Sequence, residues 1–281
     1  MRTTKIKKPH VSHPDAENKK EPYLSVIVPA YNEAKRLSLT LIDIDRHLST
    51  APFTYEIIVV DNNSKDATKE IALRFVSIIK NMRVIECKTQ GKGAAVKKGM
   101  LEARGEIRLF TDADNSTSID HFLKMRHYFS TDNAYDDRSG AHYDVVIGSR
   151  DVEGSRMEPP QPWYRRVLGD MGNLFIQFLL LRGIKDTQCG FKAFSKRAAL
   201  AVFPLATITG WGFDVEVLAL AKKQGFLIKE VPVVWVNNPF SHVKPTAYLF
   251  VLLEVVKIKF RMLRGYYEKR SIGNNGDQTN N

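Results

Sequence analysis

Residues 107–114, with the sequence IRLFTDAD, join a short apolar run to two acidic residues. The apolar part, Ile107 to Phe110, predicts a buried β-strand, and Asp112-Ala113-Asp114 predicts a turn at the end of that strand. Two carboxylates spaced two residues apart in a turn can both point at one hard divalent cation, which prefers oxygen ligands. The alternative is a pair of turn-forming aspartates that only caps the next helix, so the surrounding sequence has to decide.

Short β-rich runs alternate with helix-length amphipathic segments on both sides of this stretch. The other predicted strands are Leu24 to Val28, Glu56 to Val60, Arg83 to Glu86 and Asp144 to Ile147, and the predicted helices are Ala34 to Leu48, Asp66 to Lys80 and Gly93 to Arg104. A further helix before the last of these strands would be opened by Thr117-Ser118-Ile119-Asp120, which has the spacing of a capping box. The alternation predicts an α/β fold, with a Rossmann-like, mainly parallel sheet flanked by helices.

Polar side chains follow three of the predicted strands. The first strand runs into Pro29-Ala30-Tyr31-Asn32-Glu33 and the second into Asp61-Asn62-Asn63-Ser64, in addition to the aspartates after the fourth. Each set alone suits a strand-to-helix turn. Because parallel strands present their carboxyl ends at one edge of a sheet, three such sets favour a single binding site there.

Gln90-Gly91-Lys92-Gly93 precedes the third predicted helix. Free N–H groups at a helix start, together with a lysine, can hold a diphosphate, and the alternative is a flexible turn. The spacing Gly-x-x-x-x-Gly-Lys is absent, and no Gly-x-Gly-x-x-Gly follows the first strand. Nucleotide hydrolysis by a Walker loop and nicotinamide binding therefore rank low.

The regular alternation stops after Gly148. A proline-rich connection, Glu158 to Pro162, leads into an apolar segment with helical spacing, Trp163 to Leu181, and further helices are predicted over Lys196 to Phe203 and Phe213 to Gln224. Ile228 to Val236 is predicted to be extended and at a sheet edge, because Pro232 cannot donate to a ladder. Pro245 to Arg264 is predicted to be an amphipathic basic helix, with Glu254, Lys257, Arg261 and Arg264 on one face and apolar side chains on the other.

Bulk composition limits the function classes. The chain has 281 residues and a formal net charge of +11, from 42 Lys and Arg against 31 Asp and Glu, which favours a polyanionic partner. Only two cysteines, Cys87 and Cys189, are present, so we expect no disulfide framework and a reducing, cytoplasmic setting. No uninterrupted apolar run reaches the ~18 to 20 residues of a spanning helix. We expect a flexible basic tail over 1–22, one catalytic domain over 23–240, a membrane-surface helix over 241–270 and a disordered tail over 271–281.

An ordered set of motifs carries a resemblance. Val28 to Glu33, Asp61 with Ser64, Gly91-Lys92-Gly93, Asp112-Ala113-Asp114 and Gly148-Ser149-Arg150 resemble the motifs of family-2 glycosyltransferases of the GT-A fold. The downstream segments Asp186 to Lys192 and Phe213 to Glu216 are similar to those of dolichyl-phosphate glucosyltransferases, which act on polyprenyl phosphates. The likeness extends over roughly Leu24 to Val236, with order and spacing preserved, so it is more specific than any one motif.

The resemblance implies roles for the matching residues. Pro29, Ala30, Tyr31 and Glu33 would border the nucleoside, Asp61 would contact the base, and Lys92 the base or the diphosphate. Asp112 would lie near the ribose and the sugar, and Asp114, together with Asp112, would hold a Mg²⁺ or Mn²⁺ cofactor. The rest of the donor site would be Asn63, Gly93, Ala113, Ser149, Arg165 and Gln188. Asn62-Asn63 stands where the family more usually has Asp-Gly, which leaves the nucleotide preference and the geometry of that turn open. The resemblance implies UDP-glucose as the donor, with GDP-mannose as the alternative.

A phosphorylated lipid acceptor has to be held by cations. Arg150, Arg165, Arg166 and Lys192 are the candidates, because guanidinium and ammonium groups bind phosphate oxygens, and the alternative for each is a solvated surface charge. A phosphomonoester is already largely dianionic at neutral pH, so direct displacement would need no dedicated base and would invert the anomeric centre. Asp214 and Glu216 would help to shape the sugar or acceptor site, or would only favour the start of their helix through its dipole. Gln188 and Cys189 would line the same cavity.

Several readings of the whole chain stay open. The basic helix and the Trp163 to Leu181 segment predict attachment to the anionic, cytoplasmic face of a membrane, whereas packing on the sheet, a homodimer or a separate membrane partner would also cover apolar helices. A same-fold transferase with a soluble acceptor is one rival. A non-catalytic nucleotide-sugar or nucleic-acid binder is another, and we expect no nucleic-acid partner because no such motif is present.

Overall fold

The computed structural model of the chain describes residues 21–129, 142–160, 163–237, 246–268 and 270. The strands are β1 (Leu24–Ala30), β2 (Tyr55–Asp61), β3 (Met82–Glu86), β4 (Ile107–Thr111), β5 (Val145–Ser149), β6 (Arg156–Glu158), β7 (Phe191–Ser195), β8 (Ile228–Pro232) and β9 (Val234–Val236). The helices are α1 (Leu37–Leu48), α2 (Thr68–Val76), α3 (Lys92–Glu102), α4 (Asp120–Met125), α5 (Trp163–Leu179), α6 (Lys196–Val202), α7 (Phe213–Lys223) and α8 (Thr246–Leu263), with a 3-10 turn η1 at Arg126–Phe129. The predicted tails lie almost wholly outside the described residues.

Seven strands form one sheet in the order β3-β2-β1-β4-β7-β5-β8. Its first four strands run parallel, as the alternation predicted, and β8 lies at the edge, as Pro232 predicted. The sequence analysis missed β7, which runs antiparallel to both β4 and β5 in the middle of the sheet. It also missed β6, which pairs with β9 in a separate two-stranded sheet. The α/β, mainly parallel architecture is confirmed.

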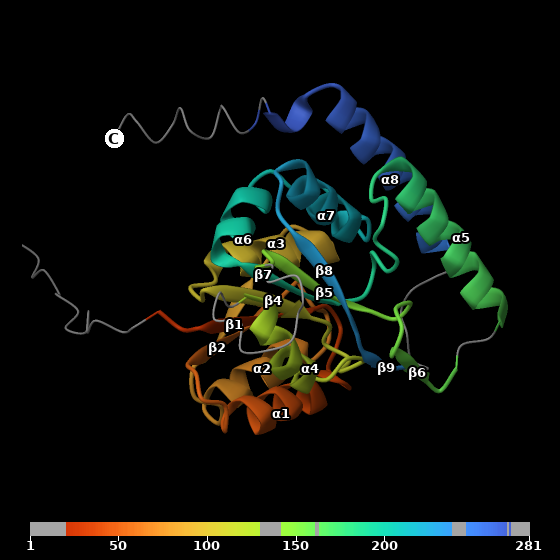
Figure 1. The fold of residues 1–281 in the computed structure, drawn as a ribbon. Helices are drawn as coiled ribbons and strands as arrows, with labels where there is room; N and C mark the ends of the chain where they lie inside the picture. Colours follow the sequence, from red (N-terminus) through yellow and green to blue (C-terminus); the bar gives the residue numbers. More distant parts are fainter. Residues whose placement is uncertain (1–20, 130–141, 161–162, 238–245, 269, 271–281) are drawn as a thin grey trace, which may run out of the picture.

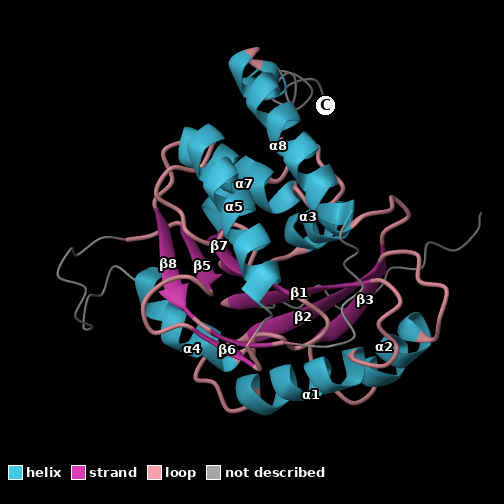
Figure 2. Ribbon diagram, turned by 90° about the vertical axis from the view of Figure 1, so that its right-hand side faces the viewer, coloured by secondary structure: helices cyan, strands magenta, loops and turns pink. Residues whose placement is uncertain are grey.

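Helices cover both faces of the large sheet. Figures 1 and 2 show α1, α2 and α4 on one face and α3, α6 and α7 on the other. Each face has its own buried apolar cluster, because Ile27, Val60 and Phe110 point to the α3 side whereas Val26, Val59 and Leu109 point to the α1 side. Alternate residues of a strand face opposite sides, so strands buried on both faces are apolar throughout.

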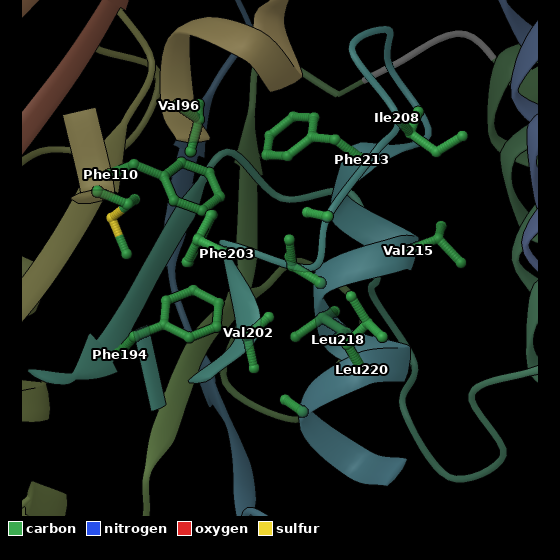
Figure 3. Close-up of a cluster of buried hydrophobic side chains, with 14 of the residues drawn as sticks. Val96, Phe110, Phe194, Val202, Phe203, Ile208, Phe213, Val215, Leu218 and Leu220 are labelled. Atoms are coloured by element: carbon green, nitrogen blue, oxygen red, sulfur yellow. The ribbon is translucent and has the colours of Figure 1, made fainter. Parts of the chain in front are cut away.

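The cluster on the α3 side fixes the start of α7 against the sheet (Figure 3). Phe110 of β4 lies between two rings, with centroids 5.6 Å from Phe213 and 6.5 Å from Phe194. Buried aromatic pairs at these separations are favourable beyond their area burial. As a result, the residues next to Phe213 and those that follow Phe110 occupy defined positions relative to each other.

The start of α4 corrects one local prediction. The N-cap residue of α4 is Ile119, and no side chain caps this helix. Ser118 instead donates to Asp43 of α1 over 2.9 Å, and the backbone N–H of Ile119 donates to the same carboxylate. The predicted capping box is therefore wrong, because a carboxylate from a neighbouring helix takes up the groups that a local cap would use.

Two long helices, α5 and α8, lie side by side beyond the sheet and its flanking layers (Figure 1). The predicted division of α8 into one polar and one apolar face is wrong. Val251, Val255 and Ile258 are buried, whereas Leu253 and Phe260 on the opposite side are exposed. None of the helices in the described part of the chain combines the length and hydropathy of a transmembrane span.

Candidate active site

The polar strand ends converge as the sequence predicted. Ala30 at the end of β1 lies in register with Asp61 at the end of β2, and β4 pairs in parallel with β1 on its other side. The backbone N–H of Asn62 donates to the carbonyl of Ala30 over 2.8 Å, which joins the two loops that leave these strands. The carboxyl ends of β1, β2 and β4 therefore share one sheet edge, where open α/β sheets bind ligands.

The Asp112-Ala113-Asp114 turn is held from three sides. Thr40 of α1 donates its hydroxyl to the carbonyl of Ala113 over 2.7 Å, and the N–H of Ser116 donates to Asp114 Oδ1 over 3.0 Å. Arg36 Nη1 lies 3.6 Å from Asp114 Oδ2. The Asp112 side chain is 34% exposed and that of Asp114 22%, so both carboxylates stay accessible from the sheet edge.

The loop before β7 packs directly on Asp112. The N–H of Asp112 donates to the carbonyl of Gly190 over 3.2 Å. A Cβ atom at position 190 would lie 2.0 Å from Asp112 Oδ2, so only glycine fits there without displacing the carboxylate. The sequence analysis singled out this segment but did not place it beside the acidic turn.

Lys92 at the start of α3 forms an ion pair with Asp112, with 2.5 Å between Nζ and Oδ1. Its ammonium also lies 5.4 Å from the centroid of the Trp211 ring. Burial alone would lower the pKa of Lys92, but the carboxylates of Asp112 and Asp214 outweigh it and raise the pKa. The ammonium therefore stays charged beside the acidic turn at neutral pH.

The two glycines around Lys92 serve close packing rather than an open anion site. The N–H of Gly91 donates to Asn62 Oδ1 over 2.8 Å, and the N–H of Gly93 donates to the carbonyl of Thr209 over 2.9 Å. Gly91 has φ +121°, and a Cβ there would lie 2.1 Å from Thr209 O. The prediction that these N–H groups are free for a diphosphate is wrong, since partners within the protein occupy them.

Asn62 and Asn63 form the turn in which the family that the chain resembles more usually has an Asp-Gly pair. The Asn62 side chain is buried and donates to the carbonyls of Cys87 and Thr89, over 3.0 and 2.7 Å. Asn63 has φ +61°, a left-handed conformation that asparagine adopts more readily than most residues. The carboxylate of Asp61, also buried, accepts the N–H of Ser64. The turn thus forms with asparagine, not glycine, in the left-handed conformation.

Lys192 lies in β7 with no exposed surface. Its ammonium donates to Asp214 Oδ1 and to the carbonyl of Cys189, each over 2.5 Å. Burial raises the pKa of Asp214, although the ammonium groups of Lys192 and Lys92 oppose the rise. The prediction that Lys192 contacts an acceptor phosphate is therefore wrong for this structure, since the group is enclosed and paired.

Arg150, directly after β5, is bound by a carboxylate of the chain. Its Nε and Nη2 donate to the two oxygens of Asp186 over 2.7 and 2.9 Å. The guanidinium group also lies over the Trp235 ring, 5.5 Å from the ring centroid. Burial works against it, but Arg150 lowers the pKa of Asp186 to about 2. Asp186 also accepts the N–H groups of Gln188 and Cys189. The guanidinium fork predicted to take a phosphate in two places is used by Asp186 instead.

The other residues predicted to shape the sugar or acceptor site make their contacts within the protein or are buried. Glu216 is fully buried and accepts hydrogen bonds from the N–H and hydroxyl of Thr207, the N–H of Ile208 and the hydroxyl of Tyr267. Ser149 and Cys189 are buried, and Gln188 is half-buried. Burial of the Cys189 thiol, with a smaller contribution from the Asp186 carboxylate, raises the thiol's pKa to about 12. The side chains of Arg165 and Arg166 at the start of α5 lie outside the described residues.

The residues predicted to border a nucleoside line the β1 end of the edge. Tyr31 is 43% exposed, Pro29 is half-buried and Ala30 is buried. Glu33 forms an ion pair with Arg36 over 2.6 Å. Burial raises the pKa of Glu33, and the nearby carboxylate of Asp114 adds to this rise, whereas Arg36 opposes it. Acidic groups thus crowd the space between β1 and β4.

This donor set fits a hard divalent cation that arrives with a phosphate ligand. Among the described residues, no group of three or more His, Cys, Asp or Glu side chains forms a metal site of protein ligands alone. Asp112 and Asp114 supply accessible carboxylate oxygens, and Mg²⁺ typically takes one or two carboxylates and completes its shell with water and substrate phosphates. The residues present therefore match a cation shared with a diphosphate.

Sequence reasoning missed the residues that hold the site in place. Thr40 lies in mid-helix and Asn62 was treated only as a replacement, and neither has a local signal for its long-range contact. Trp211 stands between Gly210 and Gly212, which the sequence shows, but this pattern does not indicate that its ring lies near Lys92. Each of these residues acts across elements far apart in the chain.

Comparison with known proteins gives consistent matches. A model of glycosyl transferase family 2 matches residues 25–203. The chain is 36% identical over 259 residues to a dolichyl-phosphate beta-glucosyltransferase of Dictyostelium discoideum, with 89% of this chain and 77% of the relative covered. It is 32% identical over 251 residues to the dolichyl-phosphate beta-glucosyltransferase of Homo sapiens, with 86% and 76% covered.

Solved structures support the fold. Glucosyl-3-phosphoglycerate synthase from Mycobacterium tuberculosis, crystallised with Mn²⁺, UDP-glucose and phosphoglyceric acid, superposes with a TM-score of 0.59. It is 18% identical, and the match covers 85% of this chain and 80% of that one. The same enzyme has also been crystallised with Mg²⁺ and UDP, with a TM-score of 0.58 and 18% identity. At this level of identity the likeness concerns the fold alone.

Proposed function

Because the chain belongs to glycosyl transferase family 2, we propose that it transfers a hexosyl group, glucose from UDP-glucose, to dolichyl phosphate. The observation that carries this proposal is the accessible Asp112-Ala113-Asp114 turn at the sheet edge, with Lys92 paired to its first aspartate. The names of the relatives supply the acceptor and the sugar. The donor UDP-glucose is the one that the resemblance of the motifs implies, and an enzyme of the same fold has been crystallised with it.

The donor is proposed to lie along the ends of β1, β2 and β4. Tyr31 and Asp61 border the nucleoside, and Asp112 faces the ribose and sugar. Asp114 and Asp112 would hold a Mg²⁺ or Mn²⁺ that neutralises charge on the departing diphosphate. The ammonium of Lys92 keeps Asp112 in place through their 2.5 Å ion pair, so one accessible carboxylate has a fixed direction.

The transfer is proposed to be a single displacement. An oxygen of the acceptor phosphate forms a bond to the anomeric carbon, and the bond between that carbon and the diphosphate oxygen breaks with its electron pair left on the diphosphate. A dianionic phosphate needs no side chain to remove a proton. Attack from the face opposite the leaving group turns an α-linked donor into a β-linked product.

The acceptor phosphate is proposed to lie near the start of α5. Asn173 of α5 donates to the carbonyl of Lys185 over 2.6 Å and accepts from Thr187 over 3.1 Å, so α5 is tied to the loop that packs on Asp112. Arg165 and Arg166 belong to the first turn of this helix. Because Lys192 and Arg150 pair with internal carboxylates, Arg165 and Arg166, the other two candidates from the sequence, are proposed to bind the phosphate.

A donor panel tests the reaction. Purified protein with dolichyl phosphate and Mn²⁺ is expected to transfer glucose from UDP-glucose at least about tenfold faster than any sugar from GDP-mannose, because polar groups that pair with one base are left unpaired by the other. The product should have the β configuration when its anomeric proton coupling is measured by NMR. Transfer from GDP-mannose alone would replace the donor, and an α-linked product would contradict single displacement.

The exposed sides of α5 and α8 are proposed to rest on a membrane. An apolar hollow on α5 is lined by Met171, Leu174, Phe175 and Phe178, and Phe178 is 87% exposed. On α8, Leu263 is 73% exposed, and the exposed basic residues Lys257 and Arg264 lie on the same helix. An apolar patch bordered by basic side chains matches the interface of a leaflet with anionic lipids, such as a cytoplasmic one.

Flotation with vesicles containing phosphatidylserine tests this surface. The double variant Phe178→Glu with Leu263→Glu is expected to lose at least about tenfold in vesicle binding, because two carboxylates would enter the apolar layer. Ile78→Glu is the control, since Ile78 is 72% exposed but follows α2 on the other side of the sheet. Equal binding by the double variant and the control would exclude this surface as the one that meets lipid.

A further inference from the structure

Side chains of helix α8 contact the segment 207–212, which packs against Lys92 beside the acidic turn. Glu254 accepts the N–H of Gly212 over 2.7 Å, and Arg261 donates to the hydroxyl of Thr207. Just after α8, the Tyr267 hydroxyl donates to Glu216, which itself holds the N–H groups of Thr207 and Ile208. Both ends of the segment are therefore attached to the last helix of the described chain.

Close packing makes the Glu254 contact specific. A Cβ at Gly210 would lie 2.6 Å from Glu254 Oε1, and a Cβ at Gly212 would lie 2.7 Å from Oε2. The carboxylate therefore occupies the space that side chains at these two positions would fill. Trp211 lies between these two glycines and is itself 42% exposed.

The other side of the same segment contacts the start of α3. Thr209 accepts the N–H of Gly93, and a Cβ at Gly93 would lie 2.6 Å from the carbonyl oxygen of Ile208. The Trp211 ring lies 5.4 Å from the Lys92 ammonium, which pairs with Asp112. A continuous series of contacts thus runs from Glu254 through Trp211 and Lys92 to the acidic turn.

We propose that Glu254 is a positioning residue for the donor site. It fixes the Gly210-Trp211-Gly212 loop, which sets the position of Lys92 and through it the direction of the Asp112 carboxylate. The inference rests on the proposed function in one respect, namely that the acidic turn binds the nucleotide sugar. It assigns to α8 a second task, because this helix also carries part of the apolar surface described above.

Two variants and one control separate positioning from a general structural effect. Glu254→Ala removes the acceptor of the Gly212 N–H, whereas Glu254→Gln keeps an amide oxygen that can accept it. Lys124→Ala is the control, because Lys124 lies on α4 and its side chain is 72% exposed. For each chain, the donor KM, the kcat, the KM for dolichyl phosphate and the urea unfolding midpoint are measured. Trp211 quenching by acrylamide is taken as the difference from a matched Trp211→Phe chain, and it needs no substrate.

Glu254→Ala is expected to raise Trp211 quenching and to raise the donor KM about tenfold, the size of losing one hydrogen bond to a charged group. The KM for dolichyl phosphate should stay within about twofold, and Glu254→Gln should restore most of the donor KM. An unchanged donor KM in Glu254→Ala overturns the proposal, and so does an equal change in Lys124→Ala. If the unsubstituted chain binds no nucleotide sugar, the proposed function fails instead, while Trp211 quenching still shows whether Glu254 holds the loop.

Discussion

Replacing Asp114 with Asn is expected to lower kcat/KM for hexosyl transfer by at least about 10²-fold, the usual loss when one group that stabilises transition-state charge is removed. The amide is a weaker ligand for a hard cation, and it no longer offsets the charge of Arg36, which lies 3.6 Å away. Asp114 Oδ1 accepts one backbone N–H, and Asn can keep that contact, so the turn should remain folded. Transfer rates over a Mn²⁺ titration, together with the unfolding midpoint, measure both effects.

Asp120→Asn is the matched control for this change. Asp120 makes an ion pair with Lys124 in α4, and the Lys124 side chain is 72% exposed. Its loss should change transfer by less than about twofold, because exposed pairs contribute little. Full activity of Asp114→Asn, or an Mn²⁺ requirement equal to that of the control, would refute the assignment of Asp114 as a cation ligand.

Replacing Asp214 with Ala is expected to destabilise the fold by about 3 to 5 kcal/mol, the range measured when one partner of a buried ion pair is removed. Lys192 would keep an ammonium group in a site with no exposed surface, where only the carbonyl of Cys189 remains to accept from it. Urea unfolding followed by circular dichroism measures the change. A loss below about 1 kcal/mol would mean that water reaches the ammonium.

A second variant shows whether the charges or only the pairing matters. Lys192→Met together with Asp214→Leu removes both charges, and replacing a buried pair by apolar side chains is often neutral for stability. We therefore expect this double variant to recover most of the stability that Asp214→Ala loses. As a surface comparison, Lys124→Ala breaks an exposed pair and should cost less than about 1 kcal/mol.

The parallel part of the sheet was predictable because the sequence of each strand reflects its own burial. The strands β1, β2 and β4 are buried on both faces and read as apolar runs, and their ends carry the polar residues that the site needs. Strand β7 was missed because Lys192 is its second residue, and a lysine there argues against a buried strand. Only the partner Asp214, 22 residues further on, makes that burial tolerable, and no local pattern announces it.

The candidate site divides in the same way. The acidic turn and the strand ends were placed correctly, since their residue types and their positions after strands are visible in the sequence. Arg150 and Lys192 were assigned to a ligand because their charge is visible, whereas the carboxylates that neutralise them come from other elements. The amphipathic pattern of α8 failed for a related reason, because Glu254 and Arg261 turn inward to partners on the 207–212 segment.

The direction of β7 has a consequence for engineering. Because this strand runs against its neighbours, the loop before it arrives at the same end of the sheet as the loop after β4, and Gly190 touches Asp112 there. Two segments almost 80 residues apart in the chain thus pack directly against each other. A chimera that exchanges donor specificity between relatives should carry both segments from the same parent, since any side chain at position 190 would collide with the first aspartate.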